Sequence, residues 1–351
     1  MTTMREEKWH TQQADVGAKS TASKAERVGA TSKLLGFPSF LFSVFVLYWS
    51  LPIFAILYQI RFASPGRRNN SLDWAKSLVG FFGVTVVKTG EDSLYRGGPC
   101  LYLCNHRSWA DFFIDAYLTE GRAALMSRWL VFFVFPVFLT AVRIIRGVVL
   151  FKRGAVADKE AFNAWLDATL KRSVVPGLLV YPEGHRSLRP TSLPLKRGML
   201  HFAYGRKLPV QIIVTAGKES VMSEKALAVH FGRALVTKFS RALRPTDYPG
   251  FDAFFAAVQS TWDECWKAAY GTPAAGTPRL TIDGAHGYDY PPLMRWQLLV
   301  VTLLCILLFG GVLLASWRAL AALLAAAGAA RRAVVLLLAL WVGASASRSF
   351  V

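Results

Sequence analysis

Acidic residues are scarce in this sequence: 22 Asp and Glu stand against 41 Lys and Arg, which leaves a formal net charge of +19. This imbalance indicates an anionic partner, which could be nucleic acid, anionic lipid or a phosphorylated substrate. The basic residues are scattered and form no recognisable reader module, so nucleic acid is not expected as a partner. A basic face held against anionic lipid headgroups is an alternative explanation for much of the charge.

Cysteine is also scarce. The four cysteines, at positions 100, 104, 265 and 305, have no metal-ligand spacing, and the six histidines show none with cysteines or acids. We therefore expect no metal site and no cofactor. The cysteines are expected to be reduced and mostly buried thiols rather than a disulfide framework.

Charge is absent altogether between Lys33 and Arg61. This apolar run exceeds the roughly 20 residues that cross a hydrocarbon core about 30 Å thick, so 34–61 is predicted to be a membrane segment. Because of Pro38 and Pro52, a bent span or a short helical hairpin fits this segment as well as one straight helix does. A polar stretch precedes the run, and the run is too long for the core of a cleaved signal peptide.

The two ends of the chain differ in polarity. Residues 1–33 are predicted to be a disordered polar tail, and the acids in it argue against a mitochondrial presequence. Residues 295–351 are predicted to be a C-terminal membrane region, in which Trp296–Ala315 is about one bilayer long. Arg331 and Arg332 would lie at mid-depth of a further span, so a second full C-terminal span is not expected.

Residues 78–271 have a different pattern and are predicted to be a separate folded domain, followed by a linker over 272–294. Short apolar runs indicate buried strands: "GVTVVK", "CLYL", "GVVLF", "GLLVY" and "VQIIVT". Between them, 158–172 has the apolar spacing of an amphipathic helix. Strands that alternate with helices predict an α/β domain with a mixed, partly parallel sheet flanked by helices.

The stretch "CLYLCNHRSWADFFIDAYL" is expected to form a strand, a turn and a helix. With His106 in the turn and Ser108 near the N-cap, Asp111 lies in the first helical turn and can point back at the imidazole. The carboxylate would fix the tautomer, leaving the other ring nitrogen free to take a proton from a hydroxyl. Alternatively, His106 only caps or packs. Cys104 could be a thiol nucleophile, but an inward-facing strand residue is favoured.

A second strand and loop, "GLLVYPEGHRS", places polar residues where the carboxyl ends of strands open onto a ligand crevice. Gly184 would let the backbone approach a phosphate, and Arg186 could bind its oxygens with two parallel hydrogen bonds. Glu183 would orient Arg186 or accept a hydrogen bond from a substrate hydroxyl. The alternative is an ordinary solvated loop.

Together these motifs resemble the glycerolipid acyltransferase family, which includes the 1-acylglycerol-3-phosphate acyltransferases. The resemblance covers roughly Leu78 to Gly217. Four motifs carry it in order: Asn105, His106 and Asp111 as NHxxxxD; "GVVLFKR" with Gly147 and Arg153; "EGHR", Glu183 to Arg186; and "LPVQIIV" with Pro209. The chain departs from the family pattern at Lys152, where an acid is frequent, and at His185, where threonine is usual.

The resemblance implies an acyltransferase that moves an acyl chain from acyl-CoA to lysophosphatidic acid, giving phosphatidic acid without an acyl-enzyme. His106 would be the general base and Asp111 its orienting acid. Substrate-binding roles would fall to the remaining motif residues: Asn105, Gly147, Arg153, Glu183, Gly184 and Arg186. The endoplasmic reticulum, with the catalytic domain facing the cytosol, is the implied location. Alternatives are another lysophospholipid or glycerol-3-phosphate as acceptor, or a non-catalytic membrane scaffold.

Two features leave choices open. His185 is either a second titrating group at the acceptor phosphate or a larger substitute that only stacks and forms hydrogen bonds, and the second is favoured. Trp129–Val142 is uncharged but short for a span, so it is either an aromatic segment at the membrane interface or a core helix.

Overall fold

A seven-stranded sheet forms the centre of the chain in a computed structural model, which describes residues 29–61, 67–131, 146–151, 158–282, 286–290 and 295–350. The strand order is β1-β9-β6-β2-β5-β3-β4. In chain order the strands are β1 (Thr85–Thr89), β2 (Leu101–Cys104), β3 (Ala123–Arg128), β4 (Val148–Phe151), β5 (Gly177–Val180), β6 (Val210–Ala216) and β9 (Ala234–Phe239). Strands β7 (Met222–Ser223) and β8 (Ala228–Val229) form a separate hairpin.

The sheet is mixed, which confirms the predicted fold class. Strands β6, β2, β5, β3 and β4 run parallel, whereas β9 pairs antiparallel with β6 and parallel with β1. All five predicted strands are present. The sequence pattern missed β3 and β9, because "AALMSR" has no β-branched residue and Lys238 interrupts "ALVTKF" before its last residue, so neither forms a nearly continuous apolar run.

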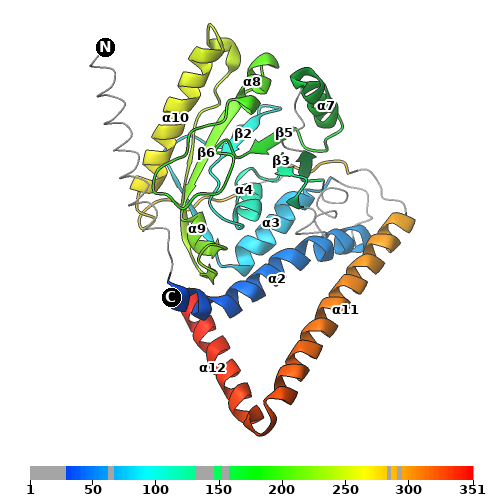
Figure 1. Cartoon of the computed structure of the whole chain (residues 1–351). Helices are drawn as coiled ribbons and strands as arrows, with labels where there is room; N and C mark the ends of the chain where they lie inside the picture. Colours follow the sequence, from blue (N-terminus) through cyan, green and yellow to red (C-terminus); the bar gives the residue numbers. More distant parts are fainter. Residues whose placement is uncertain are drawn as a thin grey trace, which may run out of the picture.

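Helices cover both faces of the sheet (Figure 1). One face packs against α2 (Ala30–Arg61), α3 (Asn70–Phe81) and α4 (Asp111–Leu118). The other packs against α7 (Lys159–Lys171), α8 (Gly198–Gly205) and α10 (Phe251–Gly271). The predicted helix over 158–172 is α7, and its first turn is capped by Asp158, whose carboxylate accepts hydrogen bonds from two backbone N–H groups.

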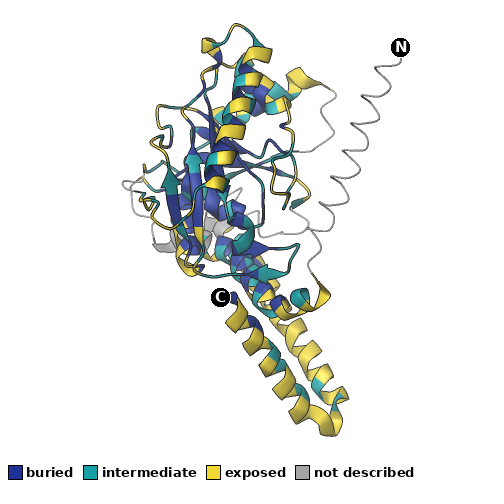
Figure 2. Cartoon of the chain, turned by 90° about the vertical axis from the view of Figure 1, so that its left-hand side faces the viewer, coloured by how far each residue is buried: buried dark blue, intermediate teal, exposed yellow. Residues whose placement is uncertain are grey.

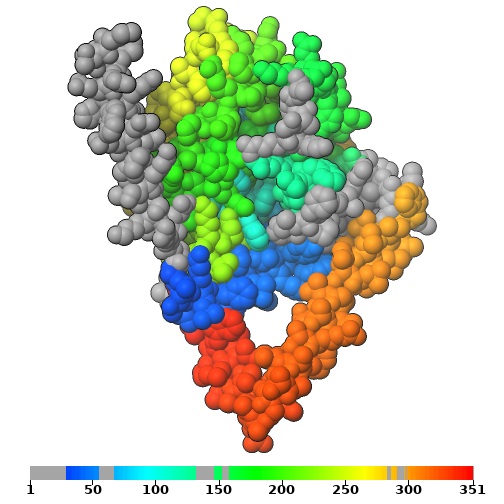
Figure 3. All heavy atoms as spheres, viewed as in Figure 1, coloured from blue at the N-terminus to red at the C-terminus, as the bar shows by residue number. Residues whose placement is uncertain are grey.

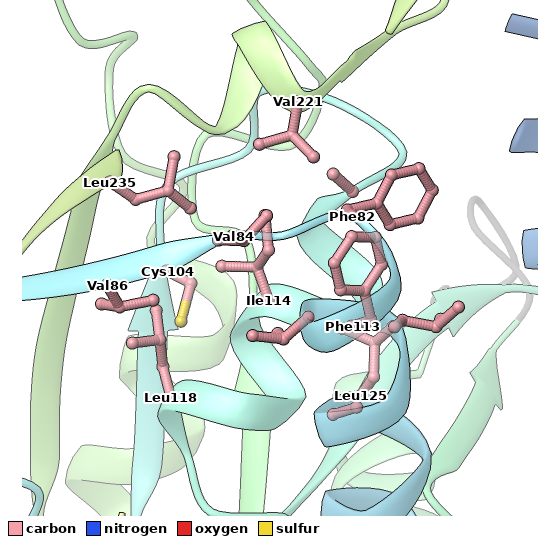
Figure 4. Close-up of a cluster of buried hydrophobic side chains, with 14 of the residues drawn as sticks. Phe82, Val84, Val86, Cys104, Phe113, Ile114, Leu118, Leu125, Val221 and Leu235 are labelled. Atoms are coloured by element: carbon pink, nitrogen blue, oxygen red, sulfur yellow. The ribbon is translucent and has the colours of Figure 1, made fainter. Parts of the chain in front are cut away.

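Alternation along the strands separates two hydrophobic clusters. In β2, Tyr102 and Cys104 belong to the α3–α4 side, whereas Leu101 and Leu103 belong to the α10 side. Figure 4 shows the first cluster, where Cys104 lies among labelled apolar side chains that include Ile114 and Leu118. Both faces of the sheet are therefore covered by apolar side chains (Figure 2). Polar functional side chains are expected at the ends of the strands.

Three helices of the described chain are long and apolar enough to cross a membrane: Ala30–Phe54 within α2, Leu299–Ala326 within α11 (Arg295–Ala326), and Gly328–Ser349, which includes α12 (Arg331–Ser349). Helix α2 lies along the base of the domain, and α11 and α12 extend below it and meet at a tip (Figures 1 and 3). The large apolar side chains of α11 and α12 are mostly exposed.

The tip corrects one sequence expectation. Arg331 and Arg332 do not lie at mid-depth of a helix, because a short 3₁₀ turn (Gly328–Ala330) separates α11 from α12 and both arginines stand in the first turn of α12. The expected reason against a second C-terminal span was therefore wrong. Most of the segment Trp129–Val142 lies outside the described residues, as does the greater part of the predicted polar tail.

Candidate active site

His106 and Asp111 meet at the carboxyl end of β2. The strand ends at Cys104, His106 lies in the following turn, and α4 begins at Asp111. The distance between His106 Nδ1 and Asp111 Oδ2 is 2.7 Å. The turn differs from the prediction in one detail: Ala110 rather than Ser108 is the N-cap residue, and Ser108 Oγ instead accepts a hydrogen bond from the Ala110 N–H.

Backbone donors hold the Asp111 carboxylate in place. Its Oδ2 also accepts hydrogen bonds from the N–H groups of Arg107 and Ser108, and the side chain is fully buried. Burial alone would raise the pKa of Asp111, but the charge of Lys218, the contact with His106 and the backbone N–H of Arg107 together lower it. Asp111 is thus an anion of fixed orientation.

The imidazole of His106 is packed as well as hydrogen-bonded. It stacks on the ring of Tyr181 with centroids 4.0 Å apart and planes 9° apart, and 17% of its side chain is exposed. Burial lowers the pKa of His106, and Asp111 offsets this only in part. The ring is therefore neutral at pH 7, with Nδ1 paired to Asp111 and Nε2 as the nitrogen that can accept a proton.

The loop after β5 is fastened to the turn that carries His106. Glu183 accepts hydrogen bonds from the N–H groups of His106 (3.2 Å) and Leu193 (3.0 Å), and the Ser187 N–H donates to the carbonyl of His106 (3.2 Å). Gly184 has φ of +81°, a left-handed conformation that favours glycine. Glu183 therefore organises backbone and does not hold Arg186, which corrects one of the two roles predicted for it.

Arg186 is oriented by a different acid. Its Nε lies 2.9 Å from Glu224 Oε1, and its guanidinium lies 5.9 Å from the centre of the Trp109 ring. Glu224 lies between β7 and β8, a hairpin that packs on the membrane-type helix α2. Arg186 is partly exposed, so an incoming anion can compete with Glu224 for it.

The structure brings only some of the predicted substrate-binding residues to this site. Asn105 is buried, and its side-chain amide exchanges two hydrogen bonds of 2.9 Å with the backbone of Thr215, so it joins β2 to β6. Gly147 directly precedes β4, at the amino end of that strand and away from the carboxyl ends that carry the site. Its carbonyl accepts a hydrogen bond from the Leu125 N–H. Arg153 and Lys152 lie outside the described residues. His185 is exposed on the loop after β5.

Cys104 is not available as a nucleophile. Its side chain is fully buried in the apolar cluster of Figure 4. Burial raises the pKa of the thiol well above its usual value, and Asp115 raises it further. Because the thiolate is the reactive form, the inward-facing interpretation of Cys104 is confirmed.

Sequence reasoning missed three residues around the pair. Tyr181, which stacks on His106, is the last residue of the predicted strand "GLLVY" but belongs to no motif. Asp115 lies four residues after Asp111, a spacing that places both acids on one face of a helix and could have been noticed. Lys218 gave no signal, since nothing in "TAGKES" indicates that this lysine is fully buried.

Comparisons with known proteins agree with the motifs. The model of the family described as Acyltransferase matches residues 85–215. A 1-acyl-sn-glycerol-3-phosphate acyltransferase from Cocos nucifera is 26% identical over 153 residues, 43% of this chain and 48% of the relative. The chain thus spans about half the length of this curated relative.

Among solved structures, the 1-acyl-sn-glycerophosphate (LPA) acyltransferase PlsC from Thermotoga maritima is similar with a TM-score of 0.47 and 15% identity, covering 64% of this chain and 94% of that one. The family match includes the turn with His106 and Asp111 and the loop with Glu183 and Arg186. The similarity to the Acyltransferase family therefore covers residues 85–215, the part of the chain that carries both motifs.

Proposed function

We propose that the chain transfers an acyl group from acyl-CoA to the free hydroxyl of lysophosphatidic acid, giving phosphatidic acid. The observation that carries this proposal is the His106–Asp111 pair at a strand end, beside a loop that presents Arg186. The Acyltransferase family match supports acyl transfer, and the name of the Cocos nucifera relative supports the acceptor.

The chemistry follows from the neutral imidazole. His106 Nε2 takes the proton of the acceptor hydroxyl while the hydroxyl oxygen attacks the thioester carbonyl. The new ester bond forms, the C–S bond of acyl-CoA breaks, and the departing thiolate takes up the proton. An acyl-enzyme is not needed, and the burial of Cys104 argues against a thiol as the intermediate acyl carrier.

The test is acylation of a panel of acceptors by membranes containing the full chain, with labelled acyl-CoA as donor. The panel holds lysophosphatidic acid, lysophospholipids with other headgroups, and glycerol-3-phosphate. Product from lysophosphatidic acid alone is expected. Product from a different acceptor would replace the substrate and keep the reaction class, and no product from any of them would leave the scaffold alternative.

Arg186 is proposed to bind the acceptor phosphate in place of Glu224. Replacing Arg186 with alanine should raise the acceptor KM by about 10- to 100-fold, the effect of a lost charge-assisted hydrogen bond, with a smaller effect on kcat. Glu224→Gln should lower KM, because it removes the competing anion. Initial rates over a range of acceptor concentrations measure both. The exposed Arg189, in the same loop, provides a matched control in Arg189→Ala; a reduced kcat with normal KM in Arg186→Ala would contradict this role.

The α11–α12 hairpin is proposed to cross the bilayer twice, with its tip on the side opposite the catalytic domain. At about 1.5 Å per residue, the 19 residues of α12 reach about 28 Å, close to the hydrocarbon thickness. Arg331 and Arg332 would then lie among the far headgroups. The catalytic domain would face the cytosol, where acyl-CoA is available, and the endoplasmic reticulum is the proposed membrane.

A labelling experiment checks the hairpin. Cysteines introduced as Ala329→Cys at the tip and His185→Cys on the domain are exposed to a membrane-impermeant maleimide in sealed vesicles. Reaction from opposite sides is expected. Reaction of both from one side would show that the hairpin does not cross the bilayer.

A further inference from the structure

Lys218 is a fully buried lysine, and lysine is rarely fully buried in proteins. It begins α9 (Lys218–Val221), directly after β6 and after Gly217, whose φ of +90° permits the sharp turn. Its side chain is fully buried. A buried lysine is costly unless its charge is balanced and its three N–H groups find acceptors, so the contacts of Lys218 need a physical explanation.

All three donors of the ammonium group have acceptors. Lys218 Nζ lies 2.9 Å from each carboxylate oxygen of Asp115 and 2.7 Å from the carbonyl oxygen of Asn105. Since a lysine has three N–H donors, this set fixes the position of Nζ. The Asn105 carbonyl belongs to the peptide bond that leads into His106, so Lys218 also holds the backbone of the catalytic turn.

Asp115 and Asp111 lie one turn apart on α4, and both are buried. Two carboxylates on the same face of a buried helix repel each other unless a cation lies between them. Lys218 Nζ is 3.6 Å from Asp111 Oδ1, beyond hydrogen-bond distance but close enough for a strong charge interaction. Because Asp111 uses Oδ2 for His106 and for the backbone N–H groups, the lysine balances its charge without taking its acceptor atom.

Other charged or titratable groups also surround this network. Those that face His106 are Asp111, Tyr181, Glu183, Arg186 and Lys218. Those that face Lys218 are Asp111, Asp115, Cys104 and Tyr181. Burial would lower the pKa of Lys218, but Asp111 and Asp115 raise it instead, so the lysine is charged at neutral pH.

We propose that Lys218 and Asp115 are positioning residues, a buried pair that holds Asp111 as an oriented carboxylate and, through it, His106 in the geometry for proton abstraction. This inference rests on the proposed function, because it assigns the pair a task in that reaction. Lys218 is fully buried and its donors are taken by protein acceptors, so no contact with the hydroxyl or the thioester is assigned to it. Its charge opposes protonation of both Asp111 and His106, so its removal should make His106 protonate more readily.

The decisive variant removes the pair as a unit. In Asp115→Leu/Lys218→Met the two opposite charges leave together, a change that is frequently neutral or even stabilising for buried ion pairs. A purely structural pair would then leave catalysis intact. For a positioning pair we expect kcat to fall about 10- to 100-fold, the effect known for groups that orient metal-bound histidines, and the acid limb of the pH profile of kcat/KM to move to higher pH.

A matched control and a second readout complete the experiment. Asp167 and Arg206 form an exposed pair between α7 and α8 on the other face of the sheet, so Asp167→Leu/Arg206→Met should leave the pH profile unchanged. Diethyl pyrocarbonate reacts with neutral imidazole, so its rate at the His106 peptide, measured by mass spectrometry over a range of pH, reports protonation of His106 without turnover. This midpoint should also move to higher pH in the Asp115/Lys218 double variant.

Every outcome decides the inference. A folded double variant with normal kcat and an unmoved His106 midpoint would overturn it. If the wild-type protein acylates no acceptor, the proposed function fails. The pH midpoint of the diethyl pyrocarbonate reaction at His106 still decides whether the pair acts on His106, since it moves in the double variant only if the pair does so. If the double variant does not fold, Lys218→Met removes only the ammonium whose charge lowers the pKa of His106, so the midpoint should again move to higher pH. An unmoved midpoint there would contradict the proposal.

Discussion

Replacing His106 with alanine is expected to lower kcat by about 10²- to 10⁴-fold, the range that a positioned general base contributes. The His106 side chain is partly exposed and is bonded to the fixed Asp111 carboxylate, whereas Cys104, two residues before it, is fully buried. The measurement is single-acceptor kinetics with saturating acyl-CoA in membranes of matched protein content. The KM for the acceptor should change little, because Arg186 rather than His106 is proposed to hold the phosphate.

The pH dependence adds a sign to this prediction. The neutral imidazole is the active form, and burial lowers the pKa of His106. The wild-type kcat/KM should therefore be level at pH 7 and fall only on the acid side, as the pH drops through that lowered pKa. His201→Ala is the control. His201 lies in α8, on the other side of the sheet, and stacks on Phe251 of α10, so its loss should leave the pH profile unchanged. Substantial activity in His106→Ala would exclude the proposed base.

Replacing Asp111 with asparagine should cost kcat a comparable factor, about 10²- to 10⁴-fold. The position of Oδ2 faces three N–H donors, so the amide oxygen is expected to take that position and the amide NH₂ to turn toward Lys218. The tautomer of His106 then survives, but the charge that stabilises the imidazolium is lost. The NH₂ group also faces a buried ammonium, which adds an unfavourable contact.

The charge loss in Asp111→Asn has its own signature. Asp111 raises the pKa of His106, so its neutralisation should move the acid limb of kcat/KM to lower pH, opposite to the shift expected when Lys218 and Asp115 are removed. The same pH titrations measure both variants. Asp167→Asn, at an exposed acid of α7, is the control, and an acid limb displaced to higher pH in Asp111→Asn would contradict the assigned electrostatics.

Much of the fold could be predicted because it depends on neighbours in sequence. The five predicted strands are nearly continuous apolar runs, and 158–172 has an acidic cap and a helical apolar period, all of which are local properties. Strand β9 escaped prediction because its lysine interrupts the pattern. That β9 runs antiparallel to β6 also has no local signature, since it depends on where the chain returns.

In the candidate site, too, contacts between sequence neighbours could be predicted and contacts between distant residues could not. The pair of His106 and Asp111 was predictable, because five residues spanning a turn and a helix start can bring the two side chains together only in a few ways. The contact of Arg186 with Glu224 joins residues 38 positions apart, and that of Asp115 with Lys218 joins residues 103 positions apart. Neither could be read from spacing, so Glu183 was wrongly considered as a partner of Arg186.

By itself the sequence determined the chemical groups of this protein: a histidine and an acid at one strand end, a glycine and an arginine at another, and apolar segments long enough for a membrane. Their order along the chain suffices, because strand, turn and helix signals act over a few residues. Only the tertiary structure decided which charges are buried together. Burial makes Asp115 and Lys218 depend on each other and on Asp111, and it depends on segments far apart in the chain that pack around one turn.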